Sequence, residues 1–298
     1  MNHKTALIVL HIIVFLFGFT AILGKLISFE SISLVWWRLI IVSISLTLFV
    51  LLRKKPLSLN RQIFGELVIV GCIVGLHWIL FFAGIKIANI AITMIAISSG
   101  TLFTAIIEPL FFRRKLDWRE CLIGLLIIIA IGLITWKESG QVENEWWGIF
   151  FGCSAALTAS IFSTWNGKLI RRTNAVTISW LELIFASIWV TVALFLFNQT
   201  EGIFDVTLSD GIYLGVLGIV CTAVPFVLSV EVMKKLTPFT VNLAINLEIV
   251  YAIILGAVIF GESEKMSPFF YVGTVIIIAL IGLNEWLKRR ANKALARQ

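Results

Sequence analysis

Charged residues are scarce in this sequence, at 14% of 298 positions, whereas hydrophobic residues make up 59%. A soluble domain of this length needs a polar surface that such a composition cannot supply. The composition therefore excludes a soluble globular protein. A formal net charge of +7 would suggest nucleic-acid binding in a soluble protein. Here the basic residues follow the pattern of a membrane protein instead, so no nucleic-acid partner is expected.

Cysteine is also rare, and the four cysteines lie inside apolar runs with no C-x-x-C spacing. This pattern favours apolar packing over metal binding or redox chemistry, so we expect no metal and no cofactor. A phosphate-binding loop is missing as well, because Leu26 and Leu169 follow the only two Gly-Lys pairs and the earlier glycine is misplaced. Transport by this chain is therefore expected to proceed without ATP hydrolysis.

What the sequence does contain is ten apolar runs, each close to the roughly 20 residues that a helix needs to cross a hydrocarbon core about 30 Å thick. The runs are 5–27, 33–52, 63–85, 90–112, 121–136, 147–167, 175–197, 211–232, 239–260 and 269–287. Open strands would leave backbone groups unpaired in lipid, so each run is predicted to be a helix. The first run is interpreted as a span and not as a removed signal peptide.

Lysine and arginine are distributed unequally between the segments that join these runs. One side holds only Lys25, Lys86, Lys137 and Lys265, and Arg38 lies within a run. All other lysines and arginines lie on the side of the two termini. The positive-inside rule then predicts an even number of spans in the cytoplasmic (inner) membrane, with both termini in the cytoplasm.

An internal repeat relates the two halves of the chain. Gly24-Lys25-Leu26-Ile27 recurs as Gly167-Lys168-Leu169-Ile170, and further pairs such as Trp37 with Trp180 and Lys86 with Lys234 keep the same order. Each half, 1–140 and 141–298, holds five runs, so the second half is predicted to enter the membrane inverted. Inverted repeats are typical of transporters that open alternately around a midplane site. The sequence therefore predicts an all-α membrane fold of ten transmembrane helices, in two inverted five-helix repeats around a central cavity.

Three G-x-x-x-G motifs predict close approach of helix backbones. They are Gly71 with Gly75, Gly148 with Gly152, and Gly211 with Gly215.

Three short motifs accompany the ten spans and short basic loops, namely the Trp37-Arg38 pair, Asn246-Leu247-Glu248 and Phe260-Gly261-Glu262. Together these features resemble the EamA family of the drug/metabolite transporter superfamily. The resemblance covers essentially the whole chain. It implies two EamA-type bundles around a central cavity and export of amino acids or other small metabolites from bacteria. The chain departs from the family at Arg113-Arg114, where a Gly-Glu pair is common, so a paired glutamate is not expected there.

A polar stripe runs along one face of the fourth span, and the repeat maps it onto the ninth. It consists of Met94, Ser98, Thr101, Ala105 and Glu108, which correspond to Asn242, Asn246, Ile249, Ile253 and Gly256. Two such stripes on symmetry-related helices predict a shared cavity in which Ser98, Thr101, Asn242 and Asn246 bind the substrate. The alternative is that they form hydrogen bonds between helices and touch no ligand.

Glu248 is a charged residue in mid-membrane, two positions from Asn246. Two positions correspond to about 200° around a helix, so both side chains can face one cavity only if the helix is unwound there. Either Glu248 binds the substrate or a proton, with the asparagines as packing contacts, or it is a buried partner for a cation.

Three further charged residues in the spans are predicted to act in gating or charge pairs. Arg38 lies beside Trp36 and Trp37, where an aromatic belt is expected, so we interpret it as extending toward the headgroups in preference to binding a ligand. Glu182 lies in the matching region of the seventh span. Glu108 is five residues before Arg113 and is expected to pair with a basic group at the cytoplasmic edge.

Histidine and tryptophan supply the remaining candidates for substrate binding. His77 and Trp78 lie in the third span and His11 in the first, although a single membrane histidine is more often a packing residue than a ligand. Trp78 and Trp165 could stack on the substrate, with core packing as the default interpretation.

These features predict an exporter of a small, amphipathic metabolite such as an amino acid, working by alternating access in the lipid bilayer as a monomer or weak dimer. Protons are a candidate coupling ion, and proton-coupled efflux of drugs or cationic compounds is the first alternative. An intramembrane enzyme is a second, but Ser98-Ser99 with His77 lacks an acidic partner set. A membrane scaffold without transport activity is the third.

Overall fold

The computed structural model describes residues 1–53, 59–138, 143–261 and 267–295, and every regular element in this part of the chain is a helix. The helices are α1 (His3–Leu26), α2 (Ser31–Arg53), α3 (Arg61–Ile87), α4 (Ile90–Ile97), α5 (Gly100–Phe112), α6 (Trp118–Glu138), α7 (Glu145–Leu169), α8 (Ala175–Leu196), α9 (Leu208–Gly215), the π-helix η1 (Val216–Ala223), α10 (Val224–Val232), α11 (Pro238–Ile245), α12 (Leu247–Phe260) and α13 (Pro268–Leu295). The predicted all-α fold is confirmed for these residues.

All ten predicted runs are helical, and three of them are divided into shorter pieces. Run 90–112 forms α4 and α5, run 239–260 forms α11 and α12, and run 211–232 forms α9, η1 and α10. Within the described residues, eight helices are long and apolar enough to cross a membrane when the pieces of each divided run are counted as one. The helices α6 and α13 are not among these eight.

Several helix starts are fixed by local sequence signals. In six helices an asparagine or threonine at the N-cap accepts a hydrogen bond from the backbone N–H three residues later, which satisfies one of the donors left free at a helix start. The capping residues are Asn2, Asn60, Asn89, Asn174, Thr207 and Thr237.

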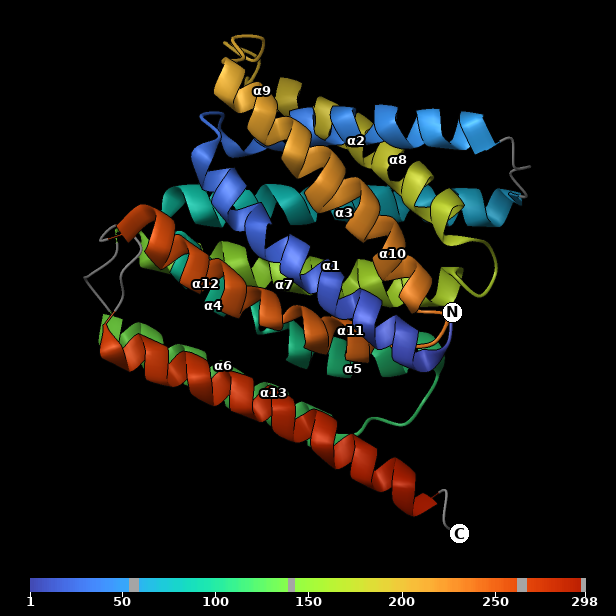
Figure 1. Ribbon diagram of the computed structural model, residues 1–298, viewed down its shortest axis with the longest axis vertical. Coiled ribbons are helices and arrows are strands. Elements are labelled where there is room, and N and C mark those ends of the chain that lie inside the picture. The colour runs from blue at the N-terminus through green and yellow to red at the C-terminus, as the bar shows by residue number, and fades with distance from the viewer. Residues whose placement is uncertain (54–58, 139–142, 262–266, 296–298) are drawn as a thin grey trace.

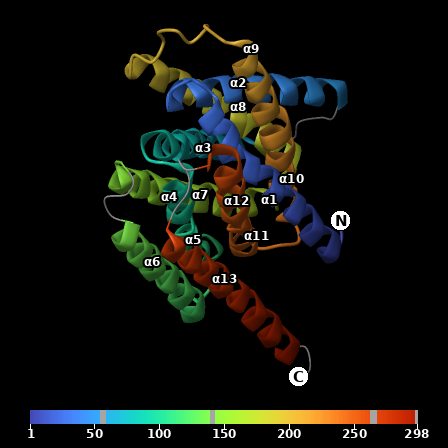
Figure 2. The ribbon, with the colours of Figure 1, turned by 60° about the vertical axis from the view of Figure 1, so that its left-hand side comes forward.

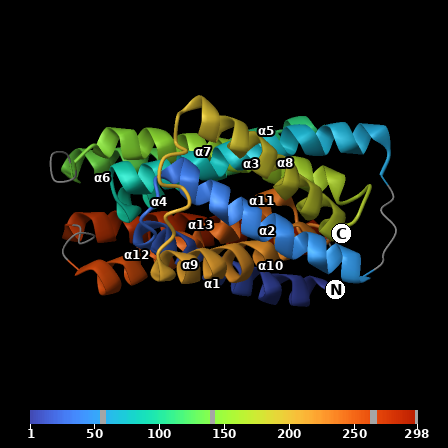
Figure 3. The same ribbon diagram turned by 90° about the horizontal axis from the view of Figure 1, so that it is seen from above.

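The helices run roughly along one direction, and the two termini lie at the same end of the bundle (Figures 1 and 3). We call this the terminal end, and the other the distal end. The pair α6 and α13 pack against each other along one edge of the molecule (Figure 2). Helix α3 has extensive contacts with both α7 and α8, so elements of the two sequence halves interlock through it.

Two of the three glycine motifs mark tight helix contacts. A Cβ at Gly71 would lie 2.6 Å from the Phe185 Cβ and 2.7 Å from the Glu182 carbonyl oxygen, and one at Gly152 would lie 2.6 Å from the Ala96 Cβ. These contacts hold α3 against α8 and α7 against α4. The prediction for the third motif was wrong, because nothing lies within 4 Å of a Cβ at Gly215. A glycine pair at this spacing permits close approach, but a facing helix must also be present.

This difference predicts opposite outcomes for two alanine substitutions. Gly71→Ala would force Phe185 and the α8 backbone apart, and overpacking of this kind costs about 1–3 kcal/mol. Gly215→Ala fills open space and should leave stability unchanged or slightly raised, since alanine is the better helix former. Thermal unfolding of the two purified proteins in one detergent measures the difference. Equal unfolding temperatures would contradict the close α3–α8 contact.

Two helix breaks lie at positions that the repeat relates to each other. Between α4 and α5, the amides of Ser98 and Ser99 donate to carbonyls three residues back, and the Ser98 hydroxyl donates to the Ile95 carbonyl at 2.6 Å. Between α11 and α12, the Ile249 amide donates to the Asn246 carbonyl in the same three-residue pattern. Such 3₁₀ turns are tighter than the α-helix and change the direction in which the following side chains point.

Candidate functional site

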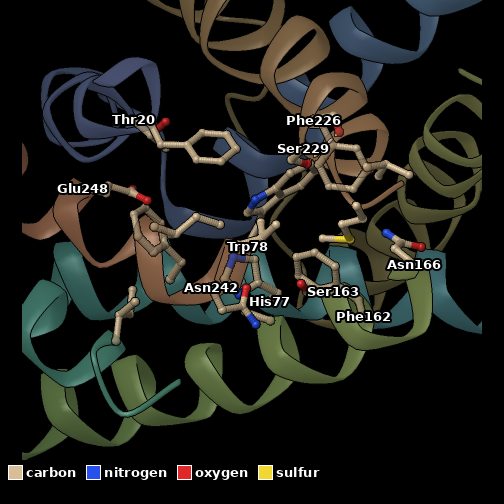
Figure 4. A pocket seen from close by; sticks show the side chains of 18 of the residues that line it. Thr20, His77, Trp78, Phe162, Ser163, Asn166, Phe226, Ser229, Asn242 and Glu248 are labelled. Atoms are coloured by element: carbon tan, nitrogen blue, oxygen red, sulfur yellow. Dashed lines mark hydrogen bonds between the residues drawn. The ribbon is translucent and has the colours of Figure 1, made fainter. Parts of the chain in front are cut away.

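A cavity of about 110 Å³ lies inside the bundle, among α1, α2, α3, α4, α7, α10, α11 and α12. A single buried water needs roughly 10–15 Å³ of such space, so this volume accommodates a small organic molecule. Its walls are mainly apolar and include the rings of Phe17, Trp78, Phe81, Phe162 and Phe226. The polar side chains on its wall are Thr20, Arg38, His77, Ser163, Asn166, Ser229, Asn242 and Glu248. Figure 4 shows Glu248 and Thr20 toward one end of the cavity and Asn166 at the other.

Arg38 lies in the wall of this cavity and is 1% exposed. Its Nε donates to Thr222 Oγ1 at 2.7 Å, and its guanidinium lies 4.2 Å from the centre of the Trp78 ring. Its Nη1 is buried and has no hydrogen-bond partner. A buried donor without a partner is costly, so this nitrogen is a candidate to bind an anionic group that enters the cavity.

The expectation that Arg38 extends toward the headgroups was wrong. Arg38 is the eighth residue of α2, about 10 Å along the helix axis from its start. The neighbouring Trp37 faces the segment before α9 instead, where its indole donates to the Ile203 carbonyl at 2.7 Å and its ring packs on Phe204. The arginine side chain turns inward between helices, because Thr222 and the aromatic rings of α3 offer it polar and cation–π contacts there.

The hydrogen-bond partner of Arg38 comes from the π-helix η1. Pro225 follows η1 and has no amide hydrogen to donate to the preceding turn, so the backbone hydrogen-bond pattern changes at that point. Within the π-helix the Thr222 hydroxyl donates to the Leu217 carbonyl, five residues back, and accepts from Arg38 Nε. The irregular turn thus supplies an oriented acceptor that fixes one side of the guanidinium.

Glu248 also lines the cavity, on α12. Arg38 and Glu248 do not form a direct ion pair, and Arg38 Nη1 has no hydrogen-bond partner. The cavity wall therefore carries one guanidinium and one carboxyl group that are not bound to each other.

Glu248 reaches the cavity from the same helical face as Val241 and Ile245. These three cavity residues are four and three positions apart, which is the spacing of one α-helical face, whereas Asn246 is about 200° around the helix from Glu248. Asn246 itself points away from the cavity, and its Nδ2 donates to Thr101 Oγ1 at 2.9 Å. Glu248 thus lies in the cavity wall and Asn246 in a helix contact, so the two side chains do not face one cavity.

The two predicted polar stripes meet each other and do not form a shared wall. Asn246 bonds to Thr101, and Asn242 Nδ2 donates to Thr104 Oγ1 at 2.8 Å. Ser98 is 0% exposed and bonds within its own helix, so it does not reach the cavity. The prediction that Ser98, Thr101 and Asn246 line the cavity was therefore wrong, while Asn242 does line it. The hydroxyl and amide groups of Thr101, Thr104, Asn242 and Asn246 satisfy one another across this contact, because a buried polar group without a partner is costly.

His77 and Trp78 both lie in the cavity wall, as the sequence suggested. The His77 Nδ1 lies 2.8 Å from the Ala155 carbonyl oxygen, which fixes that nitrogen as the protonated one in the neutral ring. Its ring packs against Phe162 at 5.4 Å. Trp78 packs against Phe226 at 5.8 Å and against the Arg38 guanidinium. These rings form the aromatic part of the wall.

His11 and Trp165 do not reach the cavity, contrary to the prediction. His11 is exposed on α1, nine positions before Thr20. Nine positions make two and a half helical turns, so His11 faces away from the cavity side of α1. Trp165 donates from Nε1 to Glu66 Oε2 at 2.9 Å and packs on Phe111, outside the cavity wall.

Glu108 lies at the terminal end of α5, where it was expected to pair with a basic group. Its Oε1 is 3.4 Å from Arg114 Nε, and its Oε2 accepts from the Phe239 amide at 2.6 Å. A carboxylate at the start of α11 is favourable, because helix N-termini carry partial positive charge. Burial lowers the pKa of Arg114, but its contacts with Glu120 and Glu108 outweigh this and raise the pKa above its usual value. The pair therefore stays ionised.

Glu182 differs from this expectation, because its carboxyl group contacts an amide and not a cation. Asn166 Nδ2 donates to Glu182 Oε2 at 3.0 Å, and Asn166 also lines the cavity. Asn166, Ser163 and Thr20 are cavity residues that sequence reasoning missed. Asn166 directly precedes the repeated Gly167-Lys168 motif, and a survey of every uncharged polar residue inside the spans would have found it.

Comparison with known proteins gives one family and one fold. The sequence model of the EamA-like transporter family matches residues 4–136 and again 146–284. No curated protein matches the chain significantly. A solved structure described only as a crystal structure of a protein covers 97% of this chain and 99% of its own, with a TM-score of 0.71 at 14% sequence identity. At that identity the likeness concerns the fold alone.

Proposed function

The chain belongs to the EamA-like transporter family, and on that premise we propose that it exports amino acids with aromatic or large aliphatic side chains. It is a multi-pass membrane transporter, and its proposed place is the cytoplasmic membrane with both termini inside. We propose that all ten runs span the bilayer and that the two matched halves are inverted repeats. The roughly equal lengths of the two family matches support this division.

The observation that carries the proposal is that a guanidinium and a carboxyl group line one apolar cavity without being bound to each other. Arg38 Nη1 lacks a partner and would bind a carboxylate, while Glu248 would bind an ammonium group. The rings of Trp78, Phe81, Phe162 and Phe226 would enclose the side chain. A zwitterion with an apolar side chain fits all three parts at once.

Contacts between the two halves support alternating access. At the distal end, Asp210 Oδ1 accepts from the Ser28 amide at 2.8 Å and Asp210 Oδ2 from the Ser28 hydroxyl at 2.7 Å. At the terminal end, Glu66 binds Arg172 Nη1 at 2.6 Å, and Glu108 binds the Phe239 amide. Each contact joins a residue of 1–140 to one of 141–298. Breaking one set at a time would open the cavity to one side of the membrane.

Efflux of cationic compounds is the second candidate. Glu248 and the aromatic walls favour it, because cations bind both carboxylates and ring faces. The buried charge of Arg38 opposes it, since a cation in this cavity would be repelled.

Counterflow in liposomes separates the two functions. Vesicles with purified protein and loaded with unlabelled L-phenylalanine should accumulate the labelled amino acid, and excess external L-phenylalanine should inhibit this. Phenethylamine lacks the carboxylate and 3-phenylpropionate lacks the amine, and each should inhibit at least tenfold more weakly, since a charged hydrogen bond contributes about 1.5–3 kcal/mol. Inhibition by phenethylamine as strong as that by the amino acid would favour cation efflux. Lack of counterflow would reject the proposed substrate.

A further inference from the structure

The pair formed by Glu182 and Asn166 has no role in substrate binding as proposed above. Glu182 is 0% exposed and Asn166 is 1% exposed. One hydrogen bond joins them, from Asn166 Nδ2 to Glu182 Oε2. The other oxygen of each group, Glu182 Oε1 and Asn166 Oδ1, is buried without a hydrogen-bond partner. Both unpartnered atoms are acceptors, so neither can satisfy the other while Glu182 is ionised.

Charged groups on the neighbouring elements do not compensate Glu182. It packs among α2, α3, α7 and α10. Their ionisable groups include Arg38, Glu66, Lys168 and Glu231, and none of them forms an ion pair with the Glu182 carboxyl, whose Oε2 is bound to Asn166 and whose Oε1 has no partner. Glu66 is bound by Arg172 and Glu231 by Lys234, while Arg38 contacts Thr222 and Trp78. An ionised carboxylate in this position would be a buried charge without a counter-ion, which costs several kcal/mol.

We propose that Glu182 and Asn166 form a proton-binding site. With a proton on Oε1, Glu182 donates to Asn166 Oδ1 while its Oε2 accepts from Asn166 Nδ2. The carboxyl and carboxamide groups then close a ring of two hydrogen bonds, and one proton satisfies both unpartnered oxygens. The buried hydroxyls of Ser179 and Ser163 lie one helical turn before Glu182 and Asn166 and are also without partners. They can both donate and accept, so they are suited to pass the proton.

The position of Asn166 connects this site to the cavity. Its side chain is part of the cavity wall (Figure 4), whereas Glu182 is buried on α8 and does not line the cavity. Loss of the proton leaves Oε1 and Asn166 Oδ1 as two facing acceptors, and the amide must turn to relieve their repulsion. Proton occupancy thus changes the polar surface that Asn166 presents to a ligand. This last step rests on the proposed transport function, but the proton site itself does not.

Infrared spectroscopy tests the proton site without any substrate. The C=O stretch of a protonated carboxyl group is recorded for protein in lipid vesicles at acid and alkaline pH. The wild-type spectrum should contain a component that is lost in Glu182→Gln and retained in Glu231→Gln, a control carboxyl in the i,i+3 pair with Lys234. Asn166→Leu should keep the component and shift its frequency. If the wild-type and Glu182→Gln spectra agree, Glu182 carries no proton and the proposal is overturned.

Transport separates this proposal from the substrate assignment. Glutamine at 182 can form both hydrogen bonds to Asn166, so it imitates the protonated carboxyl and should fold normally. Glu182→Gln should retain L-phenylalanine counterflow. An imposed proton gradient should accelerate its transport at least tenfold less than that of the wild type, whereas Glu231→Gln should respond to the gradient like the wild type. Equal gradient responses in Glu182→Gln and wild type would overturn the link to transport. An infrared band lost in Glu182→Gln, with no phenylalanine flux in the wild type, would leave the proton site standing and reject the substrate.

Discussion

Replacing Arg38 by methionine is expected to lower L-phenylalanine counterflow by about ten- to a hundredfold. The guanidinium is the cation in the cavity wall, and its Nη1 is free to donate to a carboxylate. A hydrogen bond to a charged group contributes about 1.5–3 kcal/mol, which corresponds to that range. The variant should also lose its preference for the zwitterion, so phenethylamine should compete nearly as well as the amino acid.

Stability distinguishes a binding role of Arg38 from a structural one. Removing a buried charge that lacks an ion pair is neutral or stabilising when the replacement packs well, so the unfolding temperature should not fall. Arg53→Met is the matched control, because Arg53 is exposed at the terminal end of the same helix, where it stacks on Phe49. Normal flux in Arg38→Met, or loss of flux only together with unfolding, would contradict the proposed contact.

Much of the fold follows from local signals in the sequence. The apolar runs predict where helices lie, since only helices satisfy the backbone in lipid, and side chains such as Asn89 and Asn174 set where they start. The helix breaks at Ser98-Ser99 and at Asn246 were harder to predict from the sequence. Polar residues in a helix can bond to its own backbone or across to a neighbour, and periodicity does not distinguish the two. The two polar stripes were thus recognised as polar helix faces, but they were assigned to the wall of a cavity although they form a contact between helices.

The cavity depends on contacts that are distant in sequence, which is why it was predicted only in part. Arg38 and its acceptor Thr222 are 184 residues apart, and Asn166 meets Glu182 across a helix hairpin. Whether an arginine near an aromatic belt points to the headgroups or inward depends on what the facing helices offer. Here Trp78 and Thr222 decide it. Glu248 and His77 were found because each interrupts a long apolar run, and such residues are rare enough in a membrane span to stand out. Asn242 was found through its place on a polar helix face, and Trp78 as an aromatic ring beside His77.

Glu248→Gln is expected to reduce amino-acid counterflow by about tenfold or more, because the amide keeps the shape of the carboxyl but carries no charge for the substrate ammonium. The preference should change in the opposite sense to that of Arg38→Met, so that 3-phenylpropionate competes nearly as well as L-phenylalanine. Counterflow with these competitors measures both effects, and Glu231→Gln serves as the control.

The remaining alternative for Glu248 is that it serves only to compensate the charge of Arg38. In that case Glu248→Gln would leave a buried cation uncompensated and lower stability by about 3–5 kcal/mol, and the double variant Arg38→Met/Glu248→Gln would restore it. If both residues bind the substrate, each single variant stays stable, and the losses of binding free energy in the double variant are close to additive. The absence of a direct ion pair between the two groups, with Arg38 Nη1 left without a partner, favours the second outcome. Thermal unfolding and counterflow of the wild type, the two single variants and the double variant distinguish a charge pair that holds helices together from two charges that bind a ligand.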